Sequence, residues 1–208
     1  MAALQPSLLG LLDEAGPGAL AGHVERTVLG RGAWVDVRRC WISGDGALFE
    51  RLFTAVPWRA ERRTMYDRVV DVPRLVGFYG DEADLPDPVL ERARLALNHH
   101  YADELGEPFC TAGLCLYRDG SDSVAWHGDT IGRGATVDTM VAIVSLGTPR
   151  RLLLRPRGGG RAVRYEVGLG DLLVMGGSCQ RTFEHAVPKT ARPVGPRISV
   201  QFRPHGVR

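Results

Sequence analysis

The stretch VAWHGD, residues 124–129, ends a short predicted strand with two potential metal ligands, His127 and Asp129. Residues two positions apart in a strand point to the same side, so both side chains can reach one ion while Gly128 leaves room beside it. His185, much later in the chain, supplies a second imidazole. Two imidazoles and one carboxylate are the ligand set of a non-haem Fe(II) oxygenase. The bare triplet is weak evidence, because most such matches are ordinary surface residues.

The sequence RISVQFR, residues 197–203, alternates polar and apolar residues with a period of two, as a half-buried strand does. A strand that turns two arginines to one side is costly unless an anion lies there. A dicarboxylate fits, since guanidinium binds carboxylate through two parallel hydrogen bonds. The alternative is a solvent-facing edge strand with hydrated arginines. The polar face carries Arg197, Ser199, Gln201 and Arg203.

The chain has 208 residues, of which 44% are hydrophobic and 24% charged, as expected for one globular domain. A net charge of +2 is too small to indicate a nucleic-acid partner by itself. Arginines crowd residues 150–164, however, and a local basic face could hold a phosphate backbone. A coding bias towards arginine explains the same excess, because lysine occurs only at Lys189.

Four cysteines, Cys40, Cys110, Cys115 and Cys179, lack zinc-like spacing, and no signal peptide precedes them. We therefore expect a reduced, cytoplasmic protein. No apolar run approaches the ~20 residues that span a bilayer, so no membrane partner is expected. We expect a monomer.

Helical patterns come first in the chain and strand patterns later. Residues 6–15 are a helix candidate, residues 27–42 are extended, and Ser43 is the expected cap of a helix that reaches Ala55. Pro86 and Pro88 open a second helix. Eight short strands follow, which indicates a sandwich or jelly roll with helices on one side. These strands are predicted at 114–118, 124–127, 141–146, 152–155, 163–166, 172–175, 181–185 and 197–203.

We expect a single domain over residues 1–208 with four parts. Residues 1–61 form an N-terminal extension with a helix, and 62–85 form a β-rich arm. Residues 86–113 contain the supporting helix, and 114–208 form the jelly-roll core.

Several motifs together resemble the AlkB family. They are LYRDGSDSVAWHGD at 116–129, SLG at 145–147, GDLLVM at 170–175, His185 and the 197–203 strand. The likeness covers about residue 62 to the C-terminus. It implies a mostly β (α+β) fold, a double-stranded β-helix or jelly roll, with N-terminal helices on one side and a nucleotide-recognition arm. It also implies a dioxygenase that uses Fe(II), O2 and 2-oxoglutarate to remove alkyl groups from nucleobases.

The resemblance assigns His127, Asp129 and His185 as iron ligands and catalytic residues. Tyr117 matches the tyrosine that hydrogen-bonds 2-oxoglutarate. Arg197 matches the arginine that pairs with the far carboxylate of this co-substrate.

Arg203 matches the second arginine of the family pattern R-x-N-x-T-x-R. Ser199 and Gln201 replace the asparagine and threonine of that pattern but remain candidate co-substrate contacts. Cys115 replaces an asparagine, so one co-substrate hydrogen bond is expected to be lost or taken by water. Ile131 replaces an acid that touches the substrate base, so base preference is expected to differ.

The arm between residues 62 and 85 is the expected substrate contact. By the resemblance, Met65 and Tyr66 lie at the tip and could wedge into the base stack; a plain β-turn is the alternative. Phe78 and Tyr79 could stack on a flipped base, although such residues are more often core. Arg74 could meet a phosphate, or could belong to a solvated face.

The expected reaction is oxidative demethylation of 1-methyladenine- or 3-methylcytosine-type bases in DNA, with RNA as a further candidate. The products are formaldehyde, succinate and CO2. Two alternatives remain open. One is a 2-oxoglutarate-dependent oxygenase that acts on a protein or small molecule. The other is a jelly-roll binding module without turnover, against which the intact metal triad argues.

Overall fold

Two antiparallel sheets face each other in the computed structural model, which describes residues 15–65, 68–81, 83–130 and 132–207, with side chains outside 62–71. The small sheet contains, in spatial order, β11 (Val163–Val167), β10 (Arg150–Pro156), β13 (Phe183–Val187) and β8 (Val124–His127). The large sheet contains β2 (Glu25–Gly30), β3 (Ala33–Arg38), β12 (Asp171–Gly177), β9 (Val141–Gly147), β14 (Arg197–Pro204), β7 (Phe109–Tyr117), β6 (Arg68–Tyr79) and β5 (Arg59–Met65).

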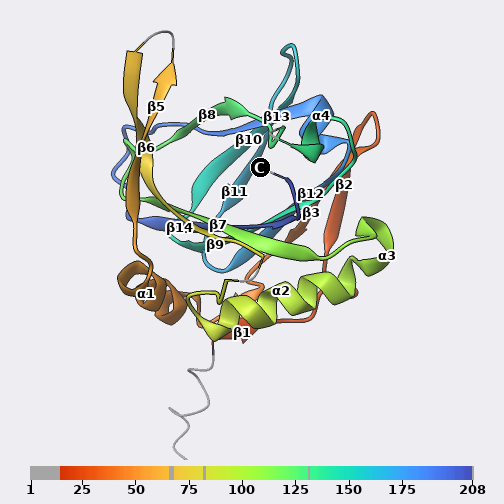
Figure 1. Ribbon diagram of the computed structural model, residues 1–208, viewed down its shortest axis with the longest axis horizontal. Coiled ribbons are helices and arrows are strands. Elements are labelled where there is room, and N and C mark those ends of the chain that lie inside the picture. Colours follow the sequence, from red (N-terminus) through yellow and green to blue (C-terminus); the bar gives the residue numbers. More distant parts are fainter. Residues whose placement is uncertain (1–14, 66–67, 82, 131, 208) are drawn as a thin grey trace, which may run out of the picture.

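The two sheets enclose a barrel-like interior, and β5 and β6 extend from it as an arm (Figure 1). One hydrophobic core lies between the sheets and includes Ile143, Leu154 and Leu173. Strands of both sheets contribute to this core, so the arrangement is a jelly roll. The predicted fold class, mostly β with a jelly roll, is confirmed.

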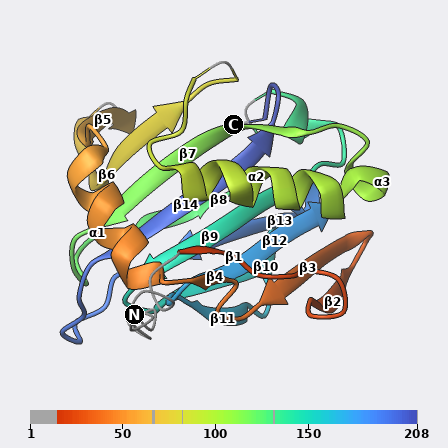
Figure 2. The same ribbon diagram turned by 90° about the horizontal axis from the view of Figure 1, so that it is seen from below.

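Helices α1 (Asp45–Ala55) and α2 (Pro88–His100) cover the outer face of the large sheet (Figure 2). A second core lies there, in which Leu52, Leu90 and Leu97 have no exposed surface. Burial of each such side chain contributes about 1.5–3 kcal/mol. The large sheet is therefore covered on both faces along its centre, as predicted for helices packed on one side.

Some element boundaries differ from those predicted. Ser43 does not cap α1, because its hydroxyl donates to the Gly16 carbonyl and the N-cap position is Gly44 in a left-handed conformation. The second helix does begin at Pro88, capped by the Asp87 side chain. The start of β7 at Phe109 lies inside the range expected for the supporting helix. The candidate helix at 6–15 falls almost entirely outside the described residues.

The remaining described elements are short. Sequence periodicity did not predict them, because each spans a single turn or a two-residue pairing. They are β1 (Gly16–Pro17), β4 (Ile42–Ser43), α3 (Ala102–Leu105), the 3-10 turn η2 (Arg133–Ala135) and α4 (Cys179–Thr182).

Strand β14 lies in the middle of the large sheet, paired with β9 on one side and β7 on the other. Both of its faces are buried: Arg197 is only 1% exposed and Val200 is fully buried. The solvent-facing edge strand considered as an alternative is therefore wrong. The two arginines on the polar face point into the interior between the sheets.

Candidate functional site

Strand pairing in the small sheet brings His127 and His185 together. They are direct cross-strand partners, since β8 pairs with β13 in antiparallel register. Their ring centroids lie 4.2 Å apart. Asp129 follows two residues after His127, and its Oδ1 lies 3.9 Å from the Nε2 atom of His127. One potential ligand atom from each of the three residues lies within 4.8 Å of the others. We call these residues the metal triad.

Hydrogen bonds fix the orientation of two triad members. His127 Nδ1 lies 2.8 Å from the Ala125 carbonyl oxygen, which can only accept, so Nδ1 carries the proton and Nε2 has a free lone pair. The backbone N–H of Asp129 donates to Gln180 Oε1 at 3.0 Å. Arg203 Nε donates to Asp129 Oδ2 at 2.7 Å, which leaves Oδ1 for a metal.

Gly128 is required by a close approach of backbone. A Cβ atom at this position would lie 2.8 Å from the Gln180 carbonyl oxygen. The loop from β8 to Asp129 can therefore pass under α4 only with glycine between the two ligands.

Burial sets the charge states of the triad. Burial lowers the pKa of His127, and it lowers the pKa of His185 to about 3. For Asp129, burial alone would raise the pKa, but the nearby Arg203 guanidinium outweighs it and holds the value at about 2. At neutral pH the triad therefore has two neutral imidazoles and one carboxylate, the donor set that a divalent first-row metal needs.

Arg197 lies beside the triad as a buried cation that the protein itself does not satisfy. Its Nη2 donates to Ser145 Oγ at 2.7 Å, and its guanidinium lies 5.2 Å from the Tyr117 ring. Its Nε and Nη1 atoms have no hydrogen-bond partner among the described residues. Burial lowers its pKa. Orphaned donors on a buried cation indicate a bound anion such as a carboxylate.

Comparison with known proteins agrees with this geometry. The family model described as 2OG-Fe(II) oxygenase superfamily matches residues 45–203. The chain belongs to this superfamily. Membership of this superfamily implies Fe(II), 2-oxoglutarate and O2, and the donor set and the unpaired arginine fit the metal and the co-substrate.

Individual relatives place the oxygenase with AlkB-type proteins. Alpha-ketoglutarate-dependent dioxygenase alkB homolog 3 of Bos taurus is 30% identical over 76% of this chain and 60% of its own length. DNA oxidative demethylase ALKBH2 of Mus musculus is 29% identical over 56% of this chain and 50% of its own length. The chain thus spans about half to 60% of the length of these relatives. The resemblance to the AlkB family is confirmed.

A solved structure shares the fold. The structure of OsALKBH1 superposes with a TM-score of 0.58 at 17% identity, over 87% of this chain and all of that chain. In the described part of the oxygenase, no helix is long and apolar enough to cross a bilayer.

The other predicted co-substrate residues of the oxygenase lie around Arg197. Tyr117 is buried, and burial raises the pKa of its phenol to about 12. Ser199 and Gln201 bond to each other, since Gln201 Nε2 donates to Ser199 Oγ at 2.6 Å. Cys115 Sγ lies 3.8 Å from Gln201 Oε1. This internal chain of polar contacts occupies the positions where the family pattern has asparagine and threonine.

Two cavities of the oxygenase meet at this polar chain. The metal pocket is lined by the two triad histidines, Tyr117 and Arg197, among others. The arm groove, of about 640 Å³, lies between the arm and β7. Its lining includes Arg59, Glu61, Phe78 and Tyr79. Both cavities share Arg74, Cys115 and Gln201 in their linings, so the groove opens next to the metal pocket.

The arm residues predicted to contact substrate differ in placement. Phe78 is 57% exposed and pairs in register with Gly113, on the interior side of the sheet. Tyr79 lines the groove but also packs against the core under the helices. Arg74 is held inward by its contact to Cys115 Sγ and donates to the Ser123 carbonyl oxygen at 3.4 Å, so it does not lie on a solvated face. Met65 ends β5, but its side chain, like Tyr66 and Ile131, lies outside the described residues.

Sequence reasoning missed Gln180, which positions the Asp129 backbone from α4. No spacing signal links a residue in a short irregular turn to the metal triad. The role of Ser145 at Arg197 was also not predicted, although the SLG motif around it was part of the resemblance.

Proposed function

We propose that the chain is a dioxygenase that removes N-linked methyl groups from nucleobases of the 1-methyladenine and 3-methylcytosine type. The observation that carries the proposal is the arm groove, which has an exposed aromatic side chain and opens directly beside the metal pocket. A flat, extruded base fits an aromatic-lined groove that ends near a reactive centre. The name of the ALKBH2 relative, a DNA oxidative demethylase, supports a nucleic-acid substrate.

In this proposal His127, Asp129 and His185 hold Fe(II). When bound, the metal with 2-oxoglutarate and O2 supplies the oxidising chemistry that converts an N-methyl group to formaldehyde, with succinate and CO2 as co-products. The protein contributes orientation. Arg203 fixes the Asp129 carboxylate, Gln180 fixes the Asp129 backbone, and the Ala125 carbonyl fixes the His127 ring.

Arg197 seats the far carboxylate of 2-oxoglutarate in this proposal. Its unpaired Nε and Nη1 atoms are donors available to the co-substrate, and Ser145 holds the guanidinium in place through Nη2. Tyr117, with its phenol kept neutral by burial, can donate to the same carboxylate. Ser199, Gln201 and Arg203 complete the wall of the pocket.

The substrate base lies in the arm groove in this proposal. Phe78 stacks on the base, and Tyr79 lines the inner end of the groove. Arg74, at the boundary of the two cavities, supplies a fixed donor to the base or its phosphate. Met65 and Tyr66 are proposed to enter the base stack of a duplex from the tip of the arm.

The test is incubation with Fe(II), ascorbate, 2-oxoglutarate and an oligonucleotide that carries 1-methyladenine or 3-methylcytosine. We expect formaldehyde, succinate and repaired base in equal amounts, and we expect Asp129→Ala to abolish all three. Parallel DNA and RNA oligonucleotides, single- and double-stranded, give the preferred polymer. Succinate without base repair would replace this proposal with a 2-oxoglutarate-dependent oxygenase that acts on a protein or small molecule. The absence of both products would favour a binding module.

A further inference from the structure

A second group of metal-binding side chains lies away from the metal triad. Asp81 follows β6, Cys110 is the second residue of β7, and His205 follows β14. One ligand atom from each lies within 4.8 Å of the others, and His205 Nδ1 contacts the Asp81 carboxylate directly. We call these three residues the second cluster. They come from three distant parts of the chain, so the fold assembles them.

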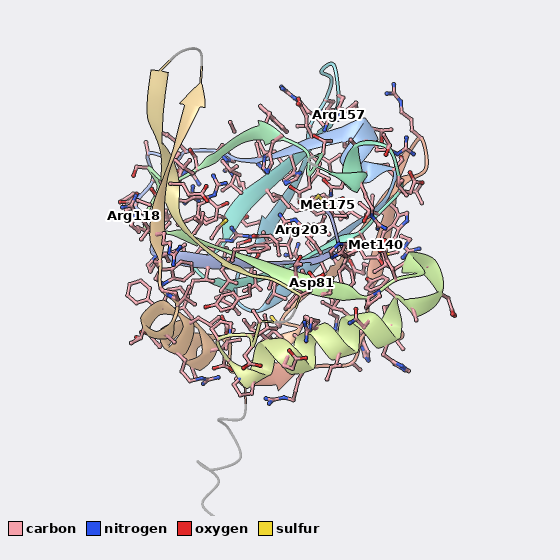
Figure 3. All side chains as sticks on the ribbon, viewed as in Figure 1. Asp81, Arg118, Met140, Arg157, Met175 and Arg203 are labelled. Carbon is pink, nitrogen blue, oxygen red and sulfur yellow. The ribbon has the colours of Figure 1, made fainter. Side chains whose placement is uncertain are left out.

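The second cluster is separate from the catalytic pocket. In β7 the odd-numbered residues Cys115 and Tyr117 line the metal pocket, and Ala112 and Leu114 face the core under the helices. Cys110 lies at a β-bulge, where Arg203 pairs with Thr111 and Pro204 with Phe109, and it does not line the metal pocket. In Figure 3, Asp81 lies between β7 and α2, whereas Arg203 lies on the interior side of β7.

We propose that Asp81, Cys110 and His205 bind a Zn(II) ion through one carboxylate oxygen, one thiolate and one imidazole nitrogen. This mixture of ligands is one that zinc uses, and three protein ligands leave a fourth position for water. Zinc bond lengths place ligand atoms of a tetrahedral site about 3.4–3.6 Å apart. The ligand atoms of the second cluster lie within 4.8 Å of one another, and the Asp81–His205 contact is already closer than the zinc spacing, so this pair must open slightly around the ion.

Two of the three side chains can move to reach the ligand spacing of a zinc site. His205 is 79% exposed and Asp81 is 38% exposed, so neither rotamer is held by packing. Cys110 is partly buried on a strand whose position is fixed, because Arg94 of α2 donates to its carbonyl oxygen at 3.1 Å. The thiol is the fixed ligand, and the other two close around the ion.

Zinc at the second cluster would hold the turn at residues 205–207 in place. After His205, the Gly206 carbonyl oxygen accepts from the Arg133 N–H at 3.0 Å, and Val207 bridges to Gly132. Residues 132–133 come shortly after the triad residue Asp129. The ion therefore ties the start of β7 and the loop after β6 to the segment that leaves the metal triad.

The experiment uses Co(II) as a spectroscopic substitute for Zn(II) in the metal-free full chain. We expect two Co(II) ions per chain and a thiolate-to-cobalt charge-transfer band in the near ultraviolet. Cys110→Ser and His205→Asn should each reduce uptake to one ion and remove the band. His205 is exposed, so His205→Asn leaves the core intact. His23→Asn is the matched control, since His23 is an exposed histidine outside both groups.

Variants of the triad separate the two sites. His127→Ala with Asp129→Ala should retain the band and one Co(II), whether or not the proposed demethylation is correct. Zn(II) should also protect Cys110, but not the exposed Cys40, from alkylation, as read by peptide mass spectrometry. Uptake of a single ion by the unmodified chain would overturn the proposal. So would a band that survives Cys110→Ser or disappears in Cys115→Ser, because Cys115 lines the metal pocket.

Discussion

Replacement of Arg197 by methionine should stabilise the ligand-free protein while it abolishes the response to 2-oxoglutarate. Arg197 is 1% exposed, and its Nε and Nη1 atoms have no partner among the described residues. Each unsatisfied buried donor costs about 1–3 kcal/mol, so the two together cost about 2–6 kcal/mol. Loss of the hydrogen bond to Ser145 removes about 1.5–3 kcal/mol, and methionine fills the remaining space. The central values, about 4 kcal/mol gained against about 2 kcal/mol lost, give a net gain of about 2 kcal/mol.

Urea unfolding of protein freed of metal and co-substrate measures this gain, which corresponds to a rise in Tm of about 2–4 °C per kcal/mol. With Mn(II) present, 2-oxoglutarate at about 100 times its Kd should stabilise the unmodified protein by about 2.7 kcal/mol and Arg197→Met not at all. Arg150→Met is the matched control. Arg150 is also buried, but it donates to the carbonyl oxygens of Asp119, Asp122 and Pro188, so its loss should destabilise the protein. If Arg197→Met destabilises the ligand-free protein as much as Arg150→Met does, the reasoning is refuted.

Four further predictions follow from the site. Gly128→Ala should destabilise the protein by about 1–3 kcal/mol in urea unfolding, because the Cβ of the new alanine would meet the Gln180 carbonyl oxygen. Gly46→Ala in α1 is the control and should be neutral or stabilising, because there is open space around Gly46. Arg203→Met should raise the pKa of Asp129 by about 1–3 units and move the midpoint of Mn(II) binding to higher pH; an unchanged midpoint would contradict the role of Arg203. The pKa of His185 is about 3 in the folded protein and about 6.5 in the unfolded chain, so protonation of the unfolded chain lowers the free energy of unfolding as the pH falls below 6.5. The ligand-free protein should therefore lose about 2 kcal/mol of stability at pH 5, and His185→Gln should remove this loss. Phe78→Ala should raise KM for methylated oligonucleotide with little change in Tm, since Phe78 is 57% exposed, and an unchanged KM would argue against stacking in the arm groove.

The sequence predicted the elements whose residues repeat regularly. The alternation in RISVQFR gave β14 and the shared face of Arg197 and Arg203, because a period of two is a direct consequence of strand geometry. The stretch at 124–127 gave β8 with the observed bounds. The resemblance then supplied the jelly roll in which β8 and β13 become neighbours.

The parts that escaped prediction depend on contacts between distant residues. Alternation alone could not show that β14 is central, because two-sided burial comes from the neighbours β9 and β7. The pairing of Gln180 with the Asp129 backbone and of Asp81 with His205 depends on where turns end in space. Ser43 looked like a helix cap by residue type, but its hydroxyl bonds to the chain at Gly16, which only the fold brings near.

The site concentrates groups that oppose folding, and this has a consequence for how the enzyme loads. An unpaired Arg197 is costly in a ligand-free interior, and the buried histidines become costly as the pH falls below 6.5. The two apolar cores on either side of the large sheet help to offset that cost. Metal and 2-oxoglutarate would share the one pocket lined by His127, His185 and Arg197. Each should therefore bind more tightly to protein that already holds the other, because a divalent cation and a dianion attract each other there. Titration of 2-oxoglutarate with and without Mn(II) measures this coupling, and equal affinities would show that the two halves of the pocket are independent.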